Sequence, residues 1–473
     1  MSGAVFIVGQ QKTRPGVYVR VTNNTAASAN AGPQGTVMVL FRSSWGPLNV
    51  ITKLSDEQTA TSTFGSGGTT DAVIQAIRSK CKTVKAYRMG TGGTGATVTL
   101  QDTTPADAVK LTLSIGTDGN GYAVTVRDSL IDDASRELLI YNGTTLVKTI
   151  PFAKGTGEPD AIVAAVNSAG LSWITATKIA DGSGTLAIVN QVSFSGGTDP
   201  TVSGTDYSNA LSAIATTQWD VLAIDSEDPS IHATVQAFID GQRDSGNLVL
   251  GVVGEPTSVP LATRQSDSQA FNDFAMHYVL NGFVDANGAQ IQGYKAAARV
   301  AGLIAAGQLT DSLTHEVIPD ATDIVGPLAN DDIEDSELAG ALVFTFNSQD
   351  QVQIDYGINT YTKPDADHDD GWKKIRRVRT RDYLISSIVA AWDPLVGKLN
   401  NDSNGRATLI SNAQTIINQM IKDDELIDGT ISEDKSNPAS GDSAWFVVAV
   451  DDYDSAEKLY INFGFEFAPQ TAS

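Results

Sequence analysis

The sequence predicts a mixed α/β protein of several domains, built on an open and mainly parallel sheet. Three observations support this class. The chain has 473 residues, a length that suits two to four domains. Continuous apolar runs at residues 37–41 and 219–225 are typical of strands buried on both faces. Helical patterns alternate with these runs, and such alternation predicts parallel strands joined by helices.

The strand–helix–strand pattern occurs in two separate stretches. It begins near residue 34, with the buried run, a helix that starts at Asp71 and a strand near 84–89. It resumes at Tyr207 and continues through an alanine-rich helix at 293–306. We therefore predict one discontinuous α/β core domain, formed by residues 34–90 and 206–340.

Residues 91–205, between these stretches, have a different composition. Glycine and threonine are frequent, and short strand-like runs are separated by hairpin turns such as Asn142-Gly143. Glycine-rich junctions lie at each end, at residues 90–95 and 196–204. We predict a small, mostly β domain inserted into the α/β core.

The last predicted unit, residues 341–473, contains the clearest local patterns. A helix capped by Thr380 is expected from Asp382, because Leu384, Ile388 and Trp392 fall on one face. A second helical pattern follows from Leu409 to Met420. Residues 459–467 close the unit with the strongest strand signal in the protein, since alternate positions are apolar: Leu459, Ile461, Phe463, Phe465 and Phe467.

Residues 1–33 are predicted to be a weakly structured arm with one lone strand at 17–21. A strand without a partner leaves its backbone groups unsatisfied and is an aggregation hazard. We therefore expect the arm strand and the last strand to pair with a neighbouring molecule. The residues assigned to these two strands are Pro15, Gly16, Val17, Tyr18, Val19 and Val21, and Leu459, Tyr460, Ile461, Phe463 and Phe465.

Six basic side chains stand within ten residues of a protein whose net charge is −23: Lys373, Lys374, Arg376, Arg377, Arg379 and Arg381. One interpretation is a solvated surface, because most charge runs are only that. The other is a contact with an acidic protein, which includes another copy of this chain. Nucleic acid is disfavoured because the rest of the chain repels phosphate.

The sequence gives little support for catalysis or a cofactor. Gly90-Thr-Gly-Gly-Thr-Gly95 has the letters of a dinucleotide fingerprint, but a strand follows it where a helix is required, so a flexible junction is favoured. Residues 365–371 resemble a calcium loop, but Arg376 stands where the closing glutamate is needed. We predict a non-enzymatic protein without cofactor or metal.

The location of the protein is predicted from what its N-terminus and its single cysteine indicate. Residues 1–9 lack the features of a signal peptide, and no run is long enough to span a bilayer. Cys81 alone fits a reducing compartment. We expect a protein made in the cytoplasm, without membrane insertion.

Short motifs at both ends of the chain follow an order that is known from one family. They are Arg14-Pro-Gly-Val-Tyr18, Gly357-Ile-Asn-Thr-Tyr-Thr362, residues 372–381, Asp382-Tyr383, Val396-Gly-Lys-Leu-Asn400, Arg406 and Lys458-Leu-Tyr-Ile461. Together they resemble contractile tail sheath proteins of bacteriophages and of phage-tail-like bacteriocins (tailocins). The inserted region carries no motif that matches.

The resemblance implies a structural role. Sheath subunits form hexameric rings, stacked in a helical polymer around a tail tube, and the sheath shortens to drive the tube through a bacterial envelope. Implied partners are other copies of the chain, the tail tube protein, the baseplate and the tail terminator, in a virion tail or phage-tail-like particle. The C-terminal unit would lie innermost, with the basic run against the tube or a neighbour, and the insertion outermost.

Two other classes of function were weighed. A secreted or surface adhesin is suggested by the Gly/Thr-rich β region but lacks a signal peptide. An enzyme on the α/β sheet lacks a recognisable site.

Overall fold

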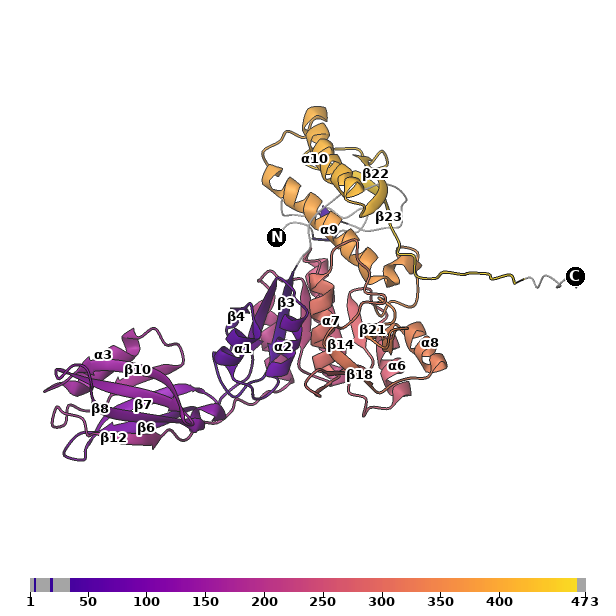
Figure 1. Ribbon diagram of the computed structural model, residues 1–473. Helices are drawn as coiled ribbons and strands as arrows, with labels where there is room; N and C mark the ends of the chain where they lie inside the picture. Colours follow the sequence, from indigo (N-terminus) through magenta and orange to yellow (C-terminus); the bar gives the residue numbers. More distant parts are fainter. Residues whose placement is uncertain (1–3, 6–17, 20–34, 466–473) are drawn as a thin grey trace, which may run out of the picture.

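The computed structural model describes residues 4–5, 18–19 and 35–465 (Figure 1). The predicted class, a mixed α/β protein of several units, is confirmed. The largest sheet has seven strands in the order β19-β15-β14-β13-β3-β5-β4, and every neighbouring pair is parallel except β4 with β5. Their bounds are β3 Thr36–Phe41, β4 Ile51–Leu54, β5 Thr83–Arg88, β13 Val221–Ile224, β14 Leu250–Gly254, β15 Met276–Val279 and β19 Ala341–Leu342.

Seven helices connect or flank these strands in the described chain: α1 Glu57–Phe64, α2 Thr70–Arg78, α4 Gly204–Ile214, α5 Pro229–Asp244, α6 Leu261–Phe271, α7 Tyr294–Ala306 and α8 Asn330–Leu338. Helix α7 can lie close to the sheet and to α2 because its inward residues are small. At Gly302 a Cβ atom would stand only 2.4 Å from the Cβ of Ser79, so this contact requires glycine.

Small antiparallel sheets complete this unit. One joins β16 Gly282–Asp285 to β17 Gln290–Ile291 and β18 Ala321–Val325, and another pairs β20 Phe344–Phe346 with β21 Val352–Ile354. All of these strands and the main sheet share one hydrophobic core.

The region between residues 91 and 203 has a separate core. A three-stranded sheet (β6 Gly95–Gln101, β7 Asp107–Ile115, β11 Ile174–Lys178) faces a four-stranded one (β8 Tyr122–Asp128, β9 Ser135–Asn142, β10 Thr145–Ala153, β12 Val189–Ser193), with the 3-10 turn η1 Thr117–Gly121 and helix α3 Glu158–Ser168. Figure 1 shows this β-rich unit standing apart from the main sheet.

The two junctions of the insertion are paired with each other and are not an open linker. Thr91 and Thr201 exchange backbone hydrogen bonds of 2.9 and 3.1 Å, and Thr94 and Thr198 do the same one step further on. Trp45, from the loop after β3, enters the core of the insertion and stacks on Tyr122, with 4.9 Å between ring centroids. The core domain therefore supplies a side chain that the insertion packs around.

The C-terminal elements are η2 Asp370–Lys373, α9 Ile375–Trp392, η3 Asp393–Leu395, α10 Ser403–Lys422, β22 Leu426–Glu433 and β23 Phe446–Asp452. Strands β22 and β23 form an antiparallel hairpin, and α9 and α10 pack beside it around a third core. Leu384, Ile388 and Trp392 lie in this core, as their spacing predicted.

Two predictions about this unit need correction. Helix α9 begins at Ile375, and Thr380 lies inside it, where its hydroxyl donates to the carbonyl of Arg376 at 3.1 Å. The boundary predicted at residue 340 falls within the large core, because β19 pairs with β15 and side chains as far as Val378 pack there. The physical division lies near residue 380, inside α9.

The Trp45 contact changes what removal of the insertion should do. Joining Met89 to Asp206 through a short linker exposes Trp45, and a large exposed aromatic side chain favours aggregation. We expect a soluble product when Trp45→Ser accompanies the deletion and an aggregating one when Trp45 is kept. Size-exclusion chromatography distinguishes the two, and insolubility of both proteins would count against the proposed boundary.

Candidate assembly interface

The first turns of helix α9 carry most of the predicted basic run, and they hold the segment that follows the hairpin. Arg377 binds Asp452 in a bidentate pair, with Nε to Oδ2 at 2.9 Å and Nη2 to Oδ1 at 2.7 Å. Arg381 donates from Nε to the same carboxylate at 3.1 Å. Asp452 is buried, and burial raises its pKa, but the two guanidinium groups outweigh burial and leave the pKa below its ordinary value. The carboxylate therefore stays charged at neutral pH and fixes the end of β23.

A second carboxylate is fixed five residues later. Glu457 Oε1 accepts hydrogen bonds from Ser312 Oγ at 2.9 Å and Thr314 Oγ1 at 2.7 Å. Its other oxygen pairs with Lys374, whose pKa is lowered by burial but raised overall by this carboxylate. Only 8% of the Glu457 side chain is exposed, although the surrounding residues 456 and 458 are exposed. This is a built site for one carboxylate.

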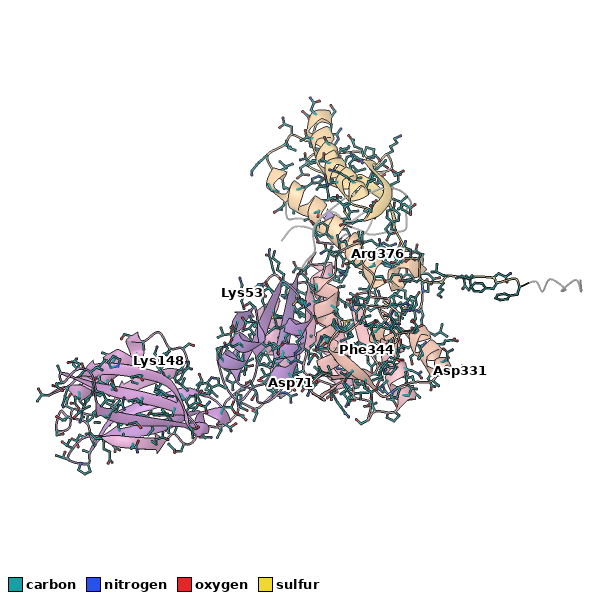
Figure 2. The ribbon with its side chains drawn as sticks, in the orientation of Figure 1. Lys53, Asp71, Lys148, Asp331, Phe344 and Arg376 are labelled. Atoms are coloured by element: carbon teal, nitrogen blue, oxygen red, sulfur yellow. The ribbon has the colours of Figure 1, made fainter. Side chains whose placement is uncertain are left out.

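Between these two points the chain continues to follow α9. Arg376 donates to the hydroxyl of Ser455 at 2.9 Å, and Lys374 lies 3.6 Å from Asp454. Figure 2 labels Arg376 at the start of the helix, near the point where the C-terminal tail leaves the body. We call residues 452–457 the acidic strap.

The other two basic residues also contact groups of the same chain. Lys373 Nζ donates to the backbone carbonyl of Glu337 at 2.9 Å. Arg379 is buried and donates to the carbonyls of Gly307 and Gln308, and burial lowers its pKa to about 10. All six side chains therefore have intramolecular partners. The solvated-surface interpretation is wrong for this run, and its contact with a tube or neighbour stays a prediction.

The C-terminal segment departs from its predicted structure. Residues 453–465 form no strand, and the large apolar and aromatic side chains along 459–465 are exposed: Leu459 77%, Tyr460 92%, Ile461 73%, Phe463 73% and Phe465 88%. The segment extends away from the body in Figure 1. The segment forms no strand in the single chain, and its pairing with a neighbouring molecule stays a prediction. Phe467 lies outside the described residues.

The predicted N-terminal strand is present only in part. Tyr18 and Val19 form β2 and pair in parallel with Ala4 and Val5 of β1. The prediction of a lone arm strand is therefore wrong, because another part of the arm supplies its partner. The other residues assigned to it, Pro15, Gly16, Val17 and Val21, lie outside the described residues.

The hairpin offers one sheet edge that is closed and one that is open. At the outer edge of β22, the side-chain amide of Gln414 on α10 donates to Gly429 O at 3.0 Å and accepts from Ile431 N at 3.3 Å. Val448 and Val450 of β23 stand opposite Ile431 and Gly429, so their N–H and C=O groups point outward. No hydrogen bond joins these outward groups to another described residue. The free edge is therefore that of β23.

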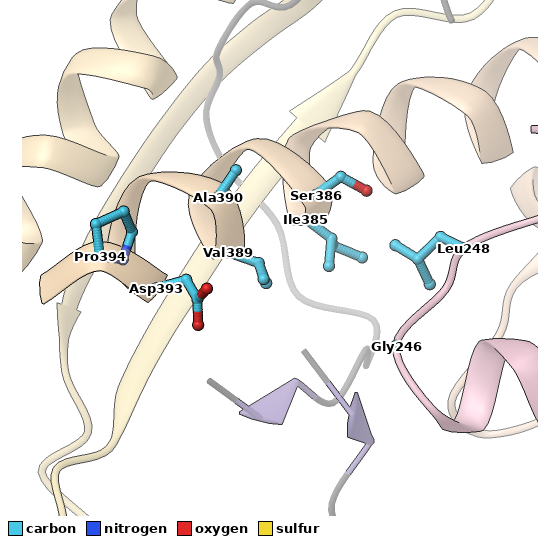
Figure 3. A pocket seen from close by; sticks show the side chains of 8 residues that line it. All are labelled: Gly246, Leu248, Ile385, Ser386, Val389, Ala390, Asp393 and Pro394. Atoms are coloured by element: carbon cyan, nitrogen blue, oxygen red, sulfur yellow. The ribbon is translucent and has the colours of Figure 1, made fainter. Parts of the chain in front are cut away.

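A cavity of about 360 Å³ lies on the other side of α9 (Figure 3). It is lined by Gly246, Leu248, Ile385, Ser386, Val389, Ala390, Asp393 and Pro394. The helix face that lines it is opposite the face that packs in the third core. Strand β1 lies against α5, the helix that precedes this lining loop.

In the loop that resembled a calcium site, residues 365–371, the first carboxylate closes a turn. Asp365 Oδ1 accepts from the backbone N–H groups of Asp367 at 2.8 Å and His368 at 2.7 Å, which closes a turn. Among the described residues, no three metal-ligating side chains are grouped to hold an ion. The described residues also include no helix long and apolar enough to cross a membrane.

Sequence reasoning missed the partners of the basic run. Asp452, Asp454, Ser455 and Glu457 had no assigned role, and neither did the edge-closing Gln414. A signal was present, because residues 451–457 carry four acidic side chains in the same C-terminal unit as the six basic ones. Opposite charge runs within one unit can satisfy each other without a second protein.

Replacement of Asp452 tests the strap's first attachment. Asp452→Asn leaves Arg377 and Arg381 buried without a charged partner, and we expect the free energy of opening β23 to fall by about 2–4 kcal/mol at pH 7. Because the folded pKa is lowered, the wild-type advantage is complete above the unfolded pKa of about 4 and disappears as pH falls through the folded value. Native-state hydrogen exchange of β23 at several pH values measures both effects.

The matched control is Asp451→Asn, since Asp451 is exposed and has no ion pair among the described residues. It should change the opening free energy by less than about 0.5 kcal/mol. Equal losses in the two variants would show that the ion pairs of Asp452 do not hold the hairpin.

Comparison with known proteins links this arrangement to one family. Residues 201–360 match the family model described as the phage tail sheath protein central domain. Two Bacillus subtilis proteins align over 98% of the chain and 99% of their own length: the uncharacterised protein YqbK at 28% identity and the phage-like element PBSX protein XkdK at 26%.

Solved structures have the same fold. The sheath tail protein of Desulfitobacterium hafniense has a TM-score of 0.71 at 20% identity, covering 93% of this chain and all of that one. The Listeria innocua sheath tail protein has a TM-score of 0.67 at 19% identity, covering 90% of this chain and 96% of that one. The contracted helical sheath of the anti-feeding prophage has a TM-score of 0.53 at 12% identity, covering 96% and 100%. Residues 201–360 therefore match the central domain of phage tail sheath proteins, and the chain has the fold of solved contractile sheath proteins.

Proposed function

We propose that the chain polymerises as hexameric rings, stacked in a helical sheath around a tail tube, by adding strands to the sheets of neighbouring copies. The observation that carries the proposal is the exposed apolar segment 459–465, in a chain whose hairpin has a free edge at β23. The apolar side chains of a neighbour's segment alternate, so all of them would lie on one face of an added strand.

Burial of the apolar side chains of this segment would stabilise an added strand. Leu459, Ile461, Phe463 and Phe465 are at least 73% exposed, and each would gain about 1.5–3 kcal/mol on burial. Backbone hydrogen bonds to the outward groups of Val448 and Val450 would add to this gain. These gains oppose the conformational entropy that the segment loses when it orders on a sheet edge.

Two of the similar structures support polymerisation. One is a helical sheath in the contracted state and another a baseplate, both of the anti-feeding prophage. We infer the same kind of assembly for this chain, with the tail tube protein, the baseplate and the tail terminator as its further partners. Assembly in the bacterial cytoplasm, before the sheath acts on an envelope, belongs to the same proposal.

The tube contact requires a revised assignment. If Arg377 and Arg379 contacted only the tube, reversing both to glutamate would weaken assembly and leave the monomer intact. Because Arg377 holds Asp452 and Arg379 is buried against two carbonyls, reversal should instead destabilise the C-terminal unit itself. A test of the tube contact should use exposed residues.

We propose domain boundaries that follow the three cores. The central domain comprises residues 35–90 and 204 to about 380, the peripheral insertion residues 91–203, and the C-terminal unit the rest of α9 and everything after it. The arm, residues 1–33, precedes them. The adhesin alternative is not favoured by any contact in this arrangement.

Truncation tests strand addition directly. Removing residues 459–473 should leave a folded, soluble subunit, because the exposed segment contributes nothing to the three cores. It should also abolish tubes and stacked rings in negative-stain micrographs.

Removal of residues 1–21 is likewise expected to leave a folded, soluble subunit that forms no tubes or stacked rings.

A shorter truncation serves as the control. Removing residues 466–473 keeps all four alternating apolar side chains from Leu459 to Phe465 and should preserve assembly. Normal tubes from the protein that lacks 459–473 would falsify the role of this segment.

A further inference from the structure

The acidic strap fixes where the exposed segment leaves the body. Its first residue, Asp452, is bound by Arg377 and Arg381, and its last, Glu457, by Ser312, Thr314 and Lys374. Ser312 and Thr314 lie between α7 and β18, in the large central unit, whereas β23 belongs to the C-terminal hairpin. The strap therefore carries the chain from one unit to the other.

Without this attachment the chain could pair with itself. Residues 453–458 separate β23 from the apolar segment, and six residues are enough to turn an antiparallel chain back on itself. The segment has the alternation of a strand, and the adjacent edge of β23 is free among the described residues. A closed chain would form a three-stranded sheet, β22-β23-459–465.

Such a closed chain could not take part in assembly. Its own segment would occupy the edge that a neighbour's segment needs, and it would have no free segment to donate. Strand exchange between copies always competes with this internal pairing, because the local segment has the higher effective concentration. Something in the fold must disfavour the internal form.

We propose that the acidic strap is an electrostatic clasp, which keeps residues 459–465 away from the edge of their own β23 and so available to a second copy of the chain. Glu457 is the main positioning residue. It lies where a returning loop would have to reverse, and its carboxylate is held by two hydroxyls and an ammonium group. In Figure 1 the C-terminal segment extends away from the β22–β23 hairpin.

The charges around the clasp agree with this role. Lys374 also lies 4.8 Å from the ring centroid of Tyr356, and Lys458 lies 5.8 Å from the same centroid, on the residue after Glu457. Two cations therefore lie near one ring, and one of them, Lys374, also pairs with the Glu457 carboxylate. Loss of the carboxylate would leave the ammonium groups of Lys374 and Lys458 to repel each other, which would release the start of the tail.

The inference rests on the proposed strand addition, but it can be tested in the unassembled subunit. The test variant is Glu457→Lys, which removes the far attachment and keeps Asp452 and the end of β23. Glu457→Ala is a second variant that adds no charge. Asp335→Lys is the control, because Asp335 is exposed, has no side-chain contact among the described residues and gives the same change in net charge.

Hydrogen exchange of dilute, unassembled protein is the measurement. In the wild type and the control, amides 459–465 should exchange as freely as in an unstructured peptide. In both Glu457 variants they should slow by about tenfold or more, because the released segment pairs with β23. The same variants should need about tenfold more protein to form tubes.

Exchange at 459–465 that stays fast in both variants would overturn the clasp. A merely structural role for Glu457 would lower overall stability without protecting these amides, so the two roles give different results. If the wild type forms no tubes, the proposed function fails, and the exchange measurement still decides whether the clasp holds the segment open.

Discussion

The ion pairs between helix α9 and the acidic strap determine how the C-terminal half of the subunit is arranged. Basic side chains at the start of a helix are unfavourable, because the N-terminal end of the helix dipole is already positive. Here the carboxylates of Asp452 and Glu457 offset that charge and are themselves kept from water. Each group compensates for the burial of the other, so removal of one partner would leave an unpaired buried charge.

Helix α9 also joins two hydrophobic cores. Ile375 and Val378 pack in the large core, and Leu384, Ile388 and Trp392 pack in the third. At the change from one core to the other, the buried Asp382 receives two hydrogen bonds of 2.7 and 2.8 Å from Arg243 at the end of α5. A rigid helix held in this way places the hairpin, the strap and the exposed segment in one fixed relation to the central sheet.

Local patterns of apolar residues correctly predicted individual strands and helices. Residues 37–41 read as a strand buried on both faces and are fully buried in β3, and the spacing of Leu384, Ile388 and Trp392 placed all three in one core. Long-range contacts were not predictable in this way. Nothing near Trp45 indicates that it stacks in the insertion, and nothing near Arg377 names Asp452, 75 residues away, as its partner.

The candidate site shows the same division. The alternation at 459–465 was recognised, but alternation produces a strand only alongside a sheet edge, and in the single chain the segment lies away from the free edge of β23. The basic run was recognised as well, but its partner was sought outside the chain. In both cases composition identified the residues, and only the fold shows which contacts are made within the chain.

The most direct test of the account is disulfide capture between two kinds of subunit, each with a single cysteine after Cys81→Ser. One carries Val448→Cys at the free edge of β23, and the other carries Ile461→Cys in the exposed segment. Because each chain has one thiol, any bridge must join two molecules, and it requires Cα atoms about 4.4–6.8 Å apart. Strand addition predicts a mixed dimer on oxidation during assembly, with Phe463→Cys as an alternative register. Tubes that assemble without any mixed dimer, in either register, would contradict it.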